Sequence, residues 1–275
     1  MMELPEAYTI SKQMQPLCGR TIQTVIANKS PHGFAFYNDD PKNYPALLEG
    51  KTIRKIKSVA GYVEMETDKE TILLGEGINI RLFEAEEKIP EKHQLLLEFD
   101  DKSALVCTIQ MYGGMWAFPK GKMDNPYYTA AREKPSPLSD EFTRKYFENM
   151  MAETKQTLSV KAFLATEQRI PGLGNGVLQD ILFNAGIHSK RKINSLTDAD
   201  KKKLFDSIQK TLQKMADDGG RNTEKTLFGK AGGYKTILSS QTLKLKNPCP
   251  ICNGPISKEQ YLGGAIYFCS NCQKI

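Results

Sequence analysis

The stretch P-G-L-G-N-G-V-L-Q-D-I-L-F-N-A-G-I-H-S, residues 171–189, joins a glycine-rich turn to a helical pattern. Its first six residues include three glycines, and apolar residues then recur at helical spacing until Gly186 ends the pattern. We therefore predict a tight turn followed by a helix over residues 175–185. Backbone N–H groups at such a helix start can approach an anion, and the helix dipole favours negative charge there. An ordinary connection between two helices is the alternative.

Cationic side chains surround this turn in the sequence. Gly174 and Asn175 would offer backbone and side-chain donors, and Lys161 and Arg169 precede them. Residues 131–275 hold 23 Lys and Arg against 14 Asp and Glu, a charge of +9, whereas residues 1–130 hold 15 against 18, or −3. This asymmetry predicts that a polyanion docks mainly on the second half. A solvated, lysine-rich surface would give the same charge.

Four of the six cysteines lie in the last 27 residues, as Cys249-Pro-Ile-Cys252 and Cys269-Ser-Asn-Cys272. Two C-x2-C knuckles at this separation suit one tetrahedral Zn²⁺ held by four thiolates. About 25 residues cannot bury a core alone, so the metal would stabilise the fold of this segment. We expect one Zn²⁺ with a structural role, because four protein ligands leave no open position for chemistry.

The N-terminal half is patterned as strands and the rest mainly as helices. We predict a short helix over 6–14 and strands over 21–29, 52–59, 62–67, 71–74, 78–83, 94–99 and 104–111, which favours a β-sandwich or barrel. Further helices are expected over 140–153 with Ser139 as N-cap, 160–166, 175–185 and 198–216. A hairpin is expected between the two cysteine knuckles. The fold class is therefore α+β and multidomain, with a domain over 1–124, a proline-rich linker over 125–137, a helical domain over 138–240 and a metal-binding segment over 241–275.

The composition excludes several classes of protein. The chain has 275 residues, of which 40% are hydrophobic and 25% charged, which is typical of globular domains rather than disordered chains. No apolar run reaches the roughly 18 residues of a membrane helix, and the N-terminus lacks the features of a secretory signal. We expect an intracellular, cytoplasmic protein without membrane contact, associated with the nucleoid if it is bacterial.

The order of the motifs resembles the formamidopyrimidine-DNA glycosylase / endonuclease VIII family of DNA repair enzymes. The resemblance spans essentially the whole chain: Met2-Glu-Leu-Pro-Glu6 at the start, Lys92-His93 before a strand, the block at 171–189, Gly219-Gly220, Gly232-Gly233-Tyr234, and FCSNCQK at the end of the metal-binding segment. It implies an N-terminal β-sandwich, a helix–two-turn–helix domain and a zinc finger, acting as a monomer on double-stranded DNA. It also implies base-excision repair, in which a damaged base is flipped out and removed.

The family's chemistry uses the α-amine of an N-terminal proline, which forms a Schiff base with the sugar before the strand is cut by β,δ-elimination. That position is Met2 here, while the glutamate that follows, the family's acid, is kept as Glu3. The resemblance places the family's lysine at Gly61 and its phosphate-gripping zinc-finger arginine at Gly264. Side chains that fill the space left by the flipped base align with Glu76, Tyr112 and Gly113.

Three functions are therefore compatible with the sequence. The first is a DNA-binding member with impaired or altered base-excision activity. The second is an active DNA glycosylase and AP lyase that uses an unconventional N-terminal amine, with Glu3 as acid. The third is an RNA-binding or protein-interaction scaffold. We favour the first, because the nucleophile, lysine, arginine and void-filling positions are all changed, while Asn175 and the four cysteines are kept.

Overall fold

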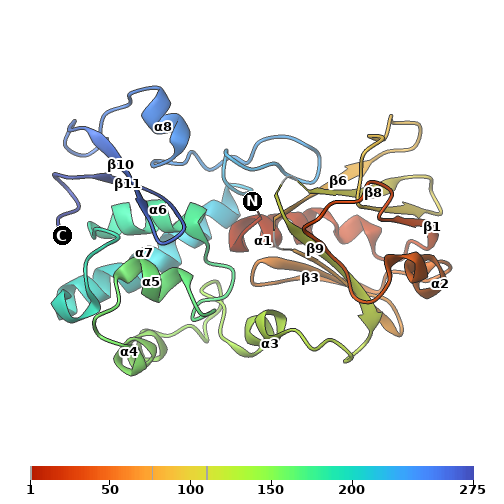
Figure 1. Cartoon of the computed structure of the whole chain (residues 1–275), viewed down its shortest axis with the longest axis horizontal. Helices are drawn as coiled ribbons and strands as arrows, with labels where there is room; N and C mark the ends of the chain where they lie inside the picture. Colours follow the sequence, from red (N-terminus) through yellow and green to blue (C-terminus); the bar gives the residue numbers. More distant parts are fainter. Residues whose placement is uncertain (1, 76, 110) are drawn as a thin grey trace. The chain divides into compact units, whose positions relative to one another are not determined.

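The computed structural model describes residues 2–75, 77–109 and 111–275. The chain forms two compact units (Figure 1). The first contains Met1–Thr129 together with Asp218–Gly233, and the second contains Ala130–Asp217 together with Tyr234–Ile275. Within the described ranges, no helix is long and apolar enough to cross a membrane.

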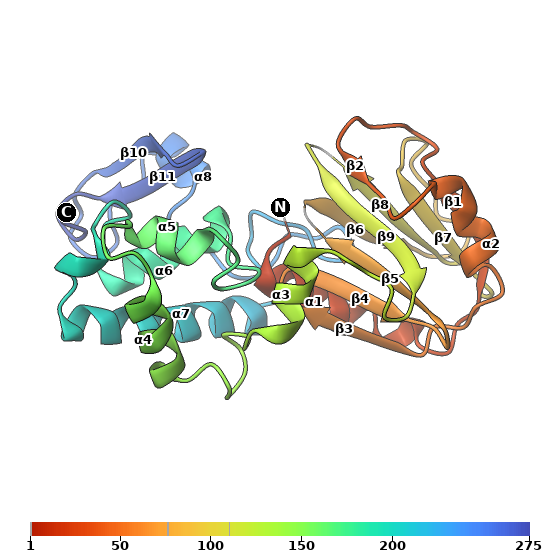
Figure 2. The same ribbon diagram turned by 60° about the horizontal axis from the view of Figure 1, so that its bottom comes forward.

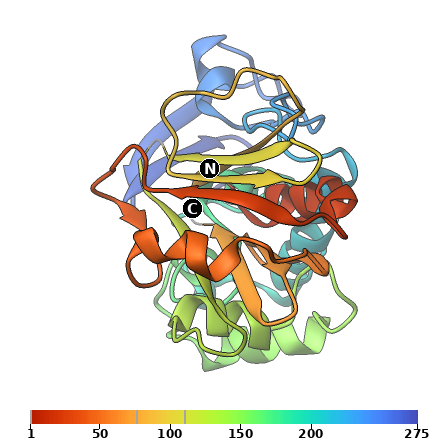
Figure 3. The ribbon, with the colours of Figure 1, turned by 90° about the vertical axis from the view of Figure 1, so that its right-hand side faces the viewer.

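The first unit contains the predicted β-sandwich. One sheet has the order β1-β7-β8-β6 and the other the order β2-β9-β5-β4-β3, and Figure 3 shows the two layers one above the other. The strands are β1 (Ile22–Ala27), β2 (Ala35–Phe36), β3 (Lys55–Val59), β4 (Tyr62–Glu66), β5 (Glu70–Gly75), β6 (Ile78–Phe83), β7 (Leu95–Phe99), β8 (Ala104–Ile109) and β9 (Gly113–Pro119). Alternate apolar residues of both sheets form one buried core, to which α1 (Leu4–Gln13), η1 (Gln15–Leu17) and α2 (Tyr44–Leu48, after η2, Pro41–Asn43) contribute.

Two strands of this unit were not anticipated. β9 begins with Gly113-Gly114, which interrupts the alternating apolar pattern that marks a strand. Glycine is needed at 114 because the Trp116 ring lies against it, and an added Cβ would come within 1.9 Å of that ring. β2 has only two residues and pairs in parallel with the start of β9, so it carries no periodicity of its own.

The stretch 125–137, expected to be a linker, contains helix α3 (Pro126–Glu133). The side chain of Asn125 accepts hydrogen bonds from the backbone of Tyr127 and Tyr128, and Pro126 occupies the first turn, where a missing N–H does no harm. Figure 2 shows α3 beside the sheet that contains β3 and β4. Its Tyr128 hydroxyl donates to the buried Glu64 carboxylate of β4.

The second unit is mostly helical. Its elements are α4 (Arg144–Glu153), α5 (Val160–Ala165), α6 (Asn175–Ala185), η3 (Ile193–Ser195), α7 (Asp198–Asp217), α8 (Ser240–Lys244) and the hairpin β10 (Ile256–Tyr261) and β11 (Gly264–Cys269). Gly186 ends α6 in the left-handed conformation at φ 68°, as the sequence predicts. A further division of this unit into domains at 138–240 and 241–275 stays a prediction.

The expected start of the helix over 140–153 is wrong. Ser139 donates its hydroxyl to the Ser136 carbonyl and so stabilises a turn. Thr143 is the N-cap instead, since its hydroxyl accepts from the Tyr146 backbone N–H at 3.1 Å. The helix therefore begins at Arg144, four residues later than the sequence predicts.

Candidate nucleic-acid interface and N-terminal site

The first described residue, Met2, is buried. Met2 is 7% exposed and belongs to the core of the first unit. Glu3 caps α1 in a reciprocal arrangement: its side chain accepts from the Glu6 backbone, and Glu6 accepts from the Glu3 backbone at 3.0 Å. Both carboxylates are buried, so the start of the chain is held in a fixed backbone conformation next to buried negative charge.

A buried arginine, which the sequence analysis missed, compensates part of this charge. Arg221 is 3% exposed; its guanidinium donates twice to Glu6, at 2.8 Å each, and lies 3.6 Å from Glu3. Although burial acts to lower it, the neighbouring Glu3 and Glu6 carboxylates raise the pKa of Arg221 above its usual range. No local pattern marks Arg221, because Glu3 and Glu6, its buried partners, are more than 200 residues away in the sequence.

Arg221 belongs to the segment 218–233, which is a closed loop fastened to the first unit. The Gly233 N–H donates to the Asp218 carbonyl at 3.0 Å, which joins the two ends of the loop. Leu227 is fully buried in the core, and its backbone bonds both Gln13 of α1 and Leu82 of β6. The loop therefore has a fixed course above the sheet.

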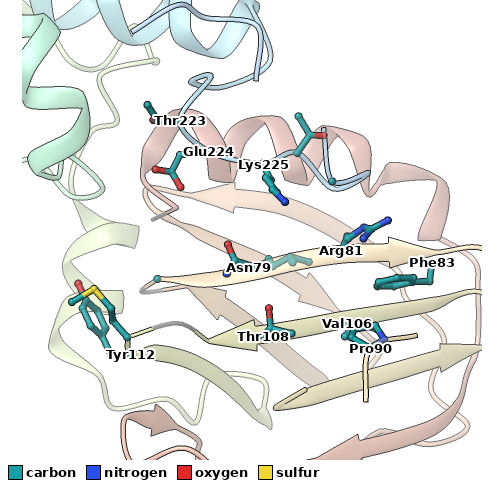
Figure 4. Close-up of a pocket in the computed structure, with 15 residues that line it drawn as sticks. Asn79, Arg81, Phe83, Pro90, Val106, Thr108, Tyr112, Thr223, Glu224 and Lys225 are labelled. Carbon is teal, nitrogen blue, oxygen red and sulfur yellow. The ribbon is translucent and has the colours of Figure 1, made fainter. Parts of the chain in front are cut away.

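This loop and the outer face of β6 and β8 enclose a cavity of about 470 Å³ (Figure 4). Asn79 and Thr108 line its floor, and Thr223–Lys225 line the loop side. The remaining lining is mixed, with Phe83, Val106 and Pro90 at one end and Tyr112 at the other, and it includes Met111. The volume lies within the usual range for small-ligand pockets.

The position assigned to the family's lysine carries no amine. Gly61 lies in the two-residue turn between β3 and β4. Lys57, the nearest lysine in the sequence on that side, is engaged by Glu64 at 2.8 Å and Glu66 at 3.3 Å. Although partial burial acts to lower it, these carboxylates raise the pKa of Lys57, so its amine is held as a paired cation.

Two of the three positions that the resemblance aligns with void-filling side chains can be located in the structure. Tyr112 is half-buried at the edge of the cavity, and Gly113 is buried at the start of β9. Glu76 lies outside the described residues.

The predicted glycine turn is confirmed as the start of α6, with Gly174 as N-cap and Asn175 exposed. The Asn175 carboxamide donates to the Ala265 carbonyl of β11 at 2.9 Å. Gly264 lies so close that an added Cβ would sit 3.4 Å from the Asn175 side chain. The turn and the tip of the hairpin therefore form one surface.

Lys161 and Arg169, which the sequence predicts as phosphate contacts, each make hydrogen bonds to backbone carbonyls within the second unit. Lys161 is 4% exposed and its ammonium donates to the Tyr261 carbonyl at 2.6 Å; burial lowers the pKa of Lys161. Arg169 folds back on the end of α5, where it donates to the Ala162 and Thr166 carbonyls and pairs with Glu167. Both cations stabilise the second unit, and their charged ends do not face solvent freely, because the backbone carbonyls they satisfy are close by.

The four cysteines converge as predicted. Their Sγ atoms all lie within 4.8 Å of one another, with Cys249 3.8 Å from Cys272 and Cys252 3.5 Å from Cys269. Such separations match thiolates around one tetrahedral ion, whose Zn–S bonds are about 2.3 Å. The Gly254 N–H donates to Cys252 Sγ and, with the neighbouring thiols, lowers the pKa of Cys252 to about 7. These residues could therefore hold a metal ion.

Comparison with known proteins agrees with this arrangement. Residues 1–153 match the formamidopyrimidine-DNA glycosylase N-terminal domain, and residues 134–226 match the formamidopyrimidine-DNA glycosylase H2TH domain. A formamidopyrimidine-DNA glycosylase of Hydrogenovibrio crunogenus is 29% identical over 279 residues, covering 100% of this chain and 97% of the relative.

Two solved structures have the same fold. A Lactococcus lactis Fpg bound to DNA with an abasic site has a TM-score of 0.83 at 23% identity, covering 99% of this chain and 100% of that one. The Lactococcus lactis Fpg bound to DNA with N7-benzyl-Fapy-dG has the same TM-score and coverage at 25% identity. Because the N-terminal domain profile alone covers more than half of the residues, the chain belongs to the formamidopyrimidine-DNA glycosylase family.

Proposed function

We propose that this protein binds duplex DNA at damaged or abasic sites and that its base-excision and strand-cleavage activity is impaired or altered. The solved relatives from Lactococcus lactis are complexes with DNA of this kind. The observation that carries the proposal is Met2, which stands where the family uses a proline amine and is 7% exposed.

Burial of Met2 fixes where a reactive amine can lie. Methionine aminopeptidase needs a small second residue, so an initiator methionine at position 1 would be retained. The free amine then lies one residue, about 3.8 Å, beyond the family's position. A misplacement of about 1 Å can already cost a hundredfold in rate. Glu3 is kept as a buried carboxylate beside this site, but it has no proline amine to assist.

The DNA-binding side of the proposal rests on Gly174 and Asn175. They lie at an exposed helix start, where backbone donors favour a phosphate, in a part of the chain with a charge of +9 over residues 131–275. Lys161 and Arg169 are left out of the proposed contacts, because their side chains are used inside the unit. The cavity under the loop at 218–233 would receive a base turned out of the duplex.

We assign one structural Zn²⁺ to Cys249, Cys252, Cys269 and Cys272. When bound, the ion would hold the two knuckles and the hairpin between them in place; with four thiolate ligands it has no open position for substrate. Cys249 and Cys269 are fully buried. They pack with Phe183 and Leu238, so the site joins the hairpin to the helical core.

Borohydride trapping on duplex DNA with one abasic site tests the proposal, together with a binding titration of the same duplex. We expect binding without a covalent adduct. An adduct through residue 1 or 2, located by mass spectrometry, would instead establish the active glycosylase and lyase. Binding to RNA or heparin at physiological salt that equals or exceeds binding to duplex DNA would favour the scaffold function. Mass spectrometry of the native N-terminus checks that Met1 is retained.

A further inference from the structure

The tip of the β10–β11 hairpin has an unusual residue in its turn. Tyr261 pairs with Gly264, which leaves a two-residue loop of Leu262 and Gly263, with φ values of 48° and 72°. Turns of this kind strongly favour Asn, Asp or Gly at the first position, because other side chains are strained at positive φ. Leu262 is the only large apolar residue with positive φ among residues 2–75, 77–109 and 111–275. Its side chain is 52% exposed.

The backbone on both sides of this turn is held firmly. Before it, the buried Lys161 ammonium donates to the Tyr261 carbonyl at 2.6 Å. After it, the Ala265 carbonyl accepts from Asn175 at 2.9 Å and from Gln179 at 3.2 Å. The Gln179 carboxamide also accepts from the Tyr267 N–H at 2.9 Å, so it pairs with β11 much as a neighbouring strand would. Leu262 is therefore an exposed side chain on a turn that is supported on both sides, and the same support includes Asn175.

We propose that Leu262 is an apolar wedge that enters duplex DNA and separates two stacked bases while Asn175 contacts the backbone nearby. This inference rests on the proposed DNA-binding function and specifies how the second unit would engage the duplex. Proteins that bend DNA often insert apolar side chains such as Leu, Ile, Met or Phe between base steps. Strained backbone is kept where the surrounding structure enforces it, and such positions gather at functional sites.

Three variants separate the wedge from the strain of the turn. Leu262→Asn removes the apolar side chain and relieves the backbone strain. Leu262→Ala removes the large side chain but keeps the strain. Leu262→Met keeps both a large apolar side chain and the strain. Affinity is measured on a duplex with an abasic site. Base unstacking is measured with 2-aminopurine beside that site, because its fluorescence rises when it leaves the stack.

We expect Leu262→Ala and Leu262→Asn to bind about tenfold more weakly and to lose most of the fluorescence rise, while Leu262→Met keeps both. Only Leu262→Asn should raise Tm, by about 2–4 °C. Affinity and fluorescence unchanged in Leu262→Ala would overturn the wedge while leaving DNA binding intact. If the unaltered protein does not bind duplex DNA, the proposed DNA-binding function is wrong, and the wedge that rests on it is wrong with it.

Discussion

Arg221 and Glu6 are 215 residues apart in the sequence, yet they form a two-pronged ion pair in which Nε and Nη2 each donate at 2.8 Å. The pair fastens the loop at 218–233 to the first helix, directly beside the N-terminal site. Both side chains are less than 5% exposed. Water therefore cannot replace either partner, and the effect of removing one should be large.

Replacing Arg221 with Met should destabilise the protein by about 3–5 kcal/mol, because Glu3 and Glu6 would remain buried without a cation. Adding Glu6→Gln should recover part of this loss, since one buried charge is removed. Urea unfolding of the single and double variants measures both effects. The exposed pair Arg54–Asp68 is the control, and Arg54→Met there should change nothing measurable. An equally small loss of unfolding free energy for Arg221→Met and Arg54→Met would contradict a stabilising role of the buried ion pair.

Asn175→Ala should weaken binding to damaged and intact duplexes by the same factor, about tenfold, because a phosphate contact carries no sequence information. Fluorescence anisotropy with both duplexes measures the ratio. The variant also loses the bond to the Ala265 carbonyl, so thermal unfolding is followed in parallel. A preference for one lesion that appears or disappears in this variant would argue against a phosphate role.

Gly264→Arg should raise DNA affinity and steepen the fall of log K with log salt by about one unit, as expected for one added phosphate contact. The backbone can accept the change, because a Cβ at 264 would meet only the Asn175 side chain, at 3.4 Å. Titrations between low and physiological salt provide the slope. Gly264→Ala is the matched control and should leave the slope unaltered; a similar slope for both variants would show that no phosphate lies near the hairpin tip.

Removing the metal should unfold the segment 249–272 and abolish DNA binding, while the first unit keeps its structure. The reason is that so short a segment has little core of its own and depends on the ion. Elemental analysis should give one zinc per chain, and hydrogen exchange after treatment with a chelator should show loss of protection confined to the second unit. Cys252→Ser should reproduce the result; full zinc content in that variant would contradict a four-cysteine site.

His188 should make stability depend on pH. Burial, opposed by Glu259 and reinforced by Lys190, lowers the pKa of His188, and its Nε2 has no hydrogen-bond partner. The unfolded chain therefore takes up a proton more readily, so the free energy of unfolding should fall as pH drops below about 6.5. His188→Asn keeps an acceptor for the Lys190 N–H and should lose that part of the dependence. If the free energy of unfolding changes by the same amount between pH 7.5 and pH 5.5 in the unaltered protein and in His188→Asn, His188 does not have this role.

The sequence by itself determined the elements whose signals are local. The helix Asn175–Ala185 and its Gly186 end, the strand Ile78–Phe83 and the four-cysteine cluster were all predicted, because glycine conformations, alternation and ligand spacing act over a few residues. The resemblance supplied the order of the domains and marked the substituted positions at Met2, Gly61 and Gly264.

Only the tertiary structure decided which cationic side chains are buried or hydrogen-bonded within the protein. The sequence predicts Lys161 and Arg169 as phosphate contacts, and in the structure both donate to backbone carbonyls of their own unit. Arg221 looks like an ordinary surface cation, yet it is buried against Glu6. The residue type gives the charge of a side chain. Its burial and its partners depend on segments that are distant in the sequence, because desolvation and ion pairing are set by which groups are close in space.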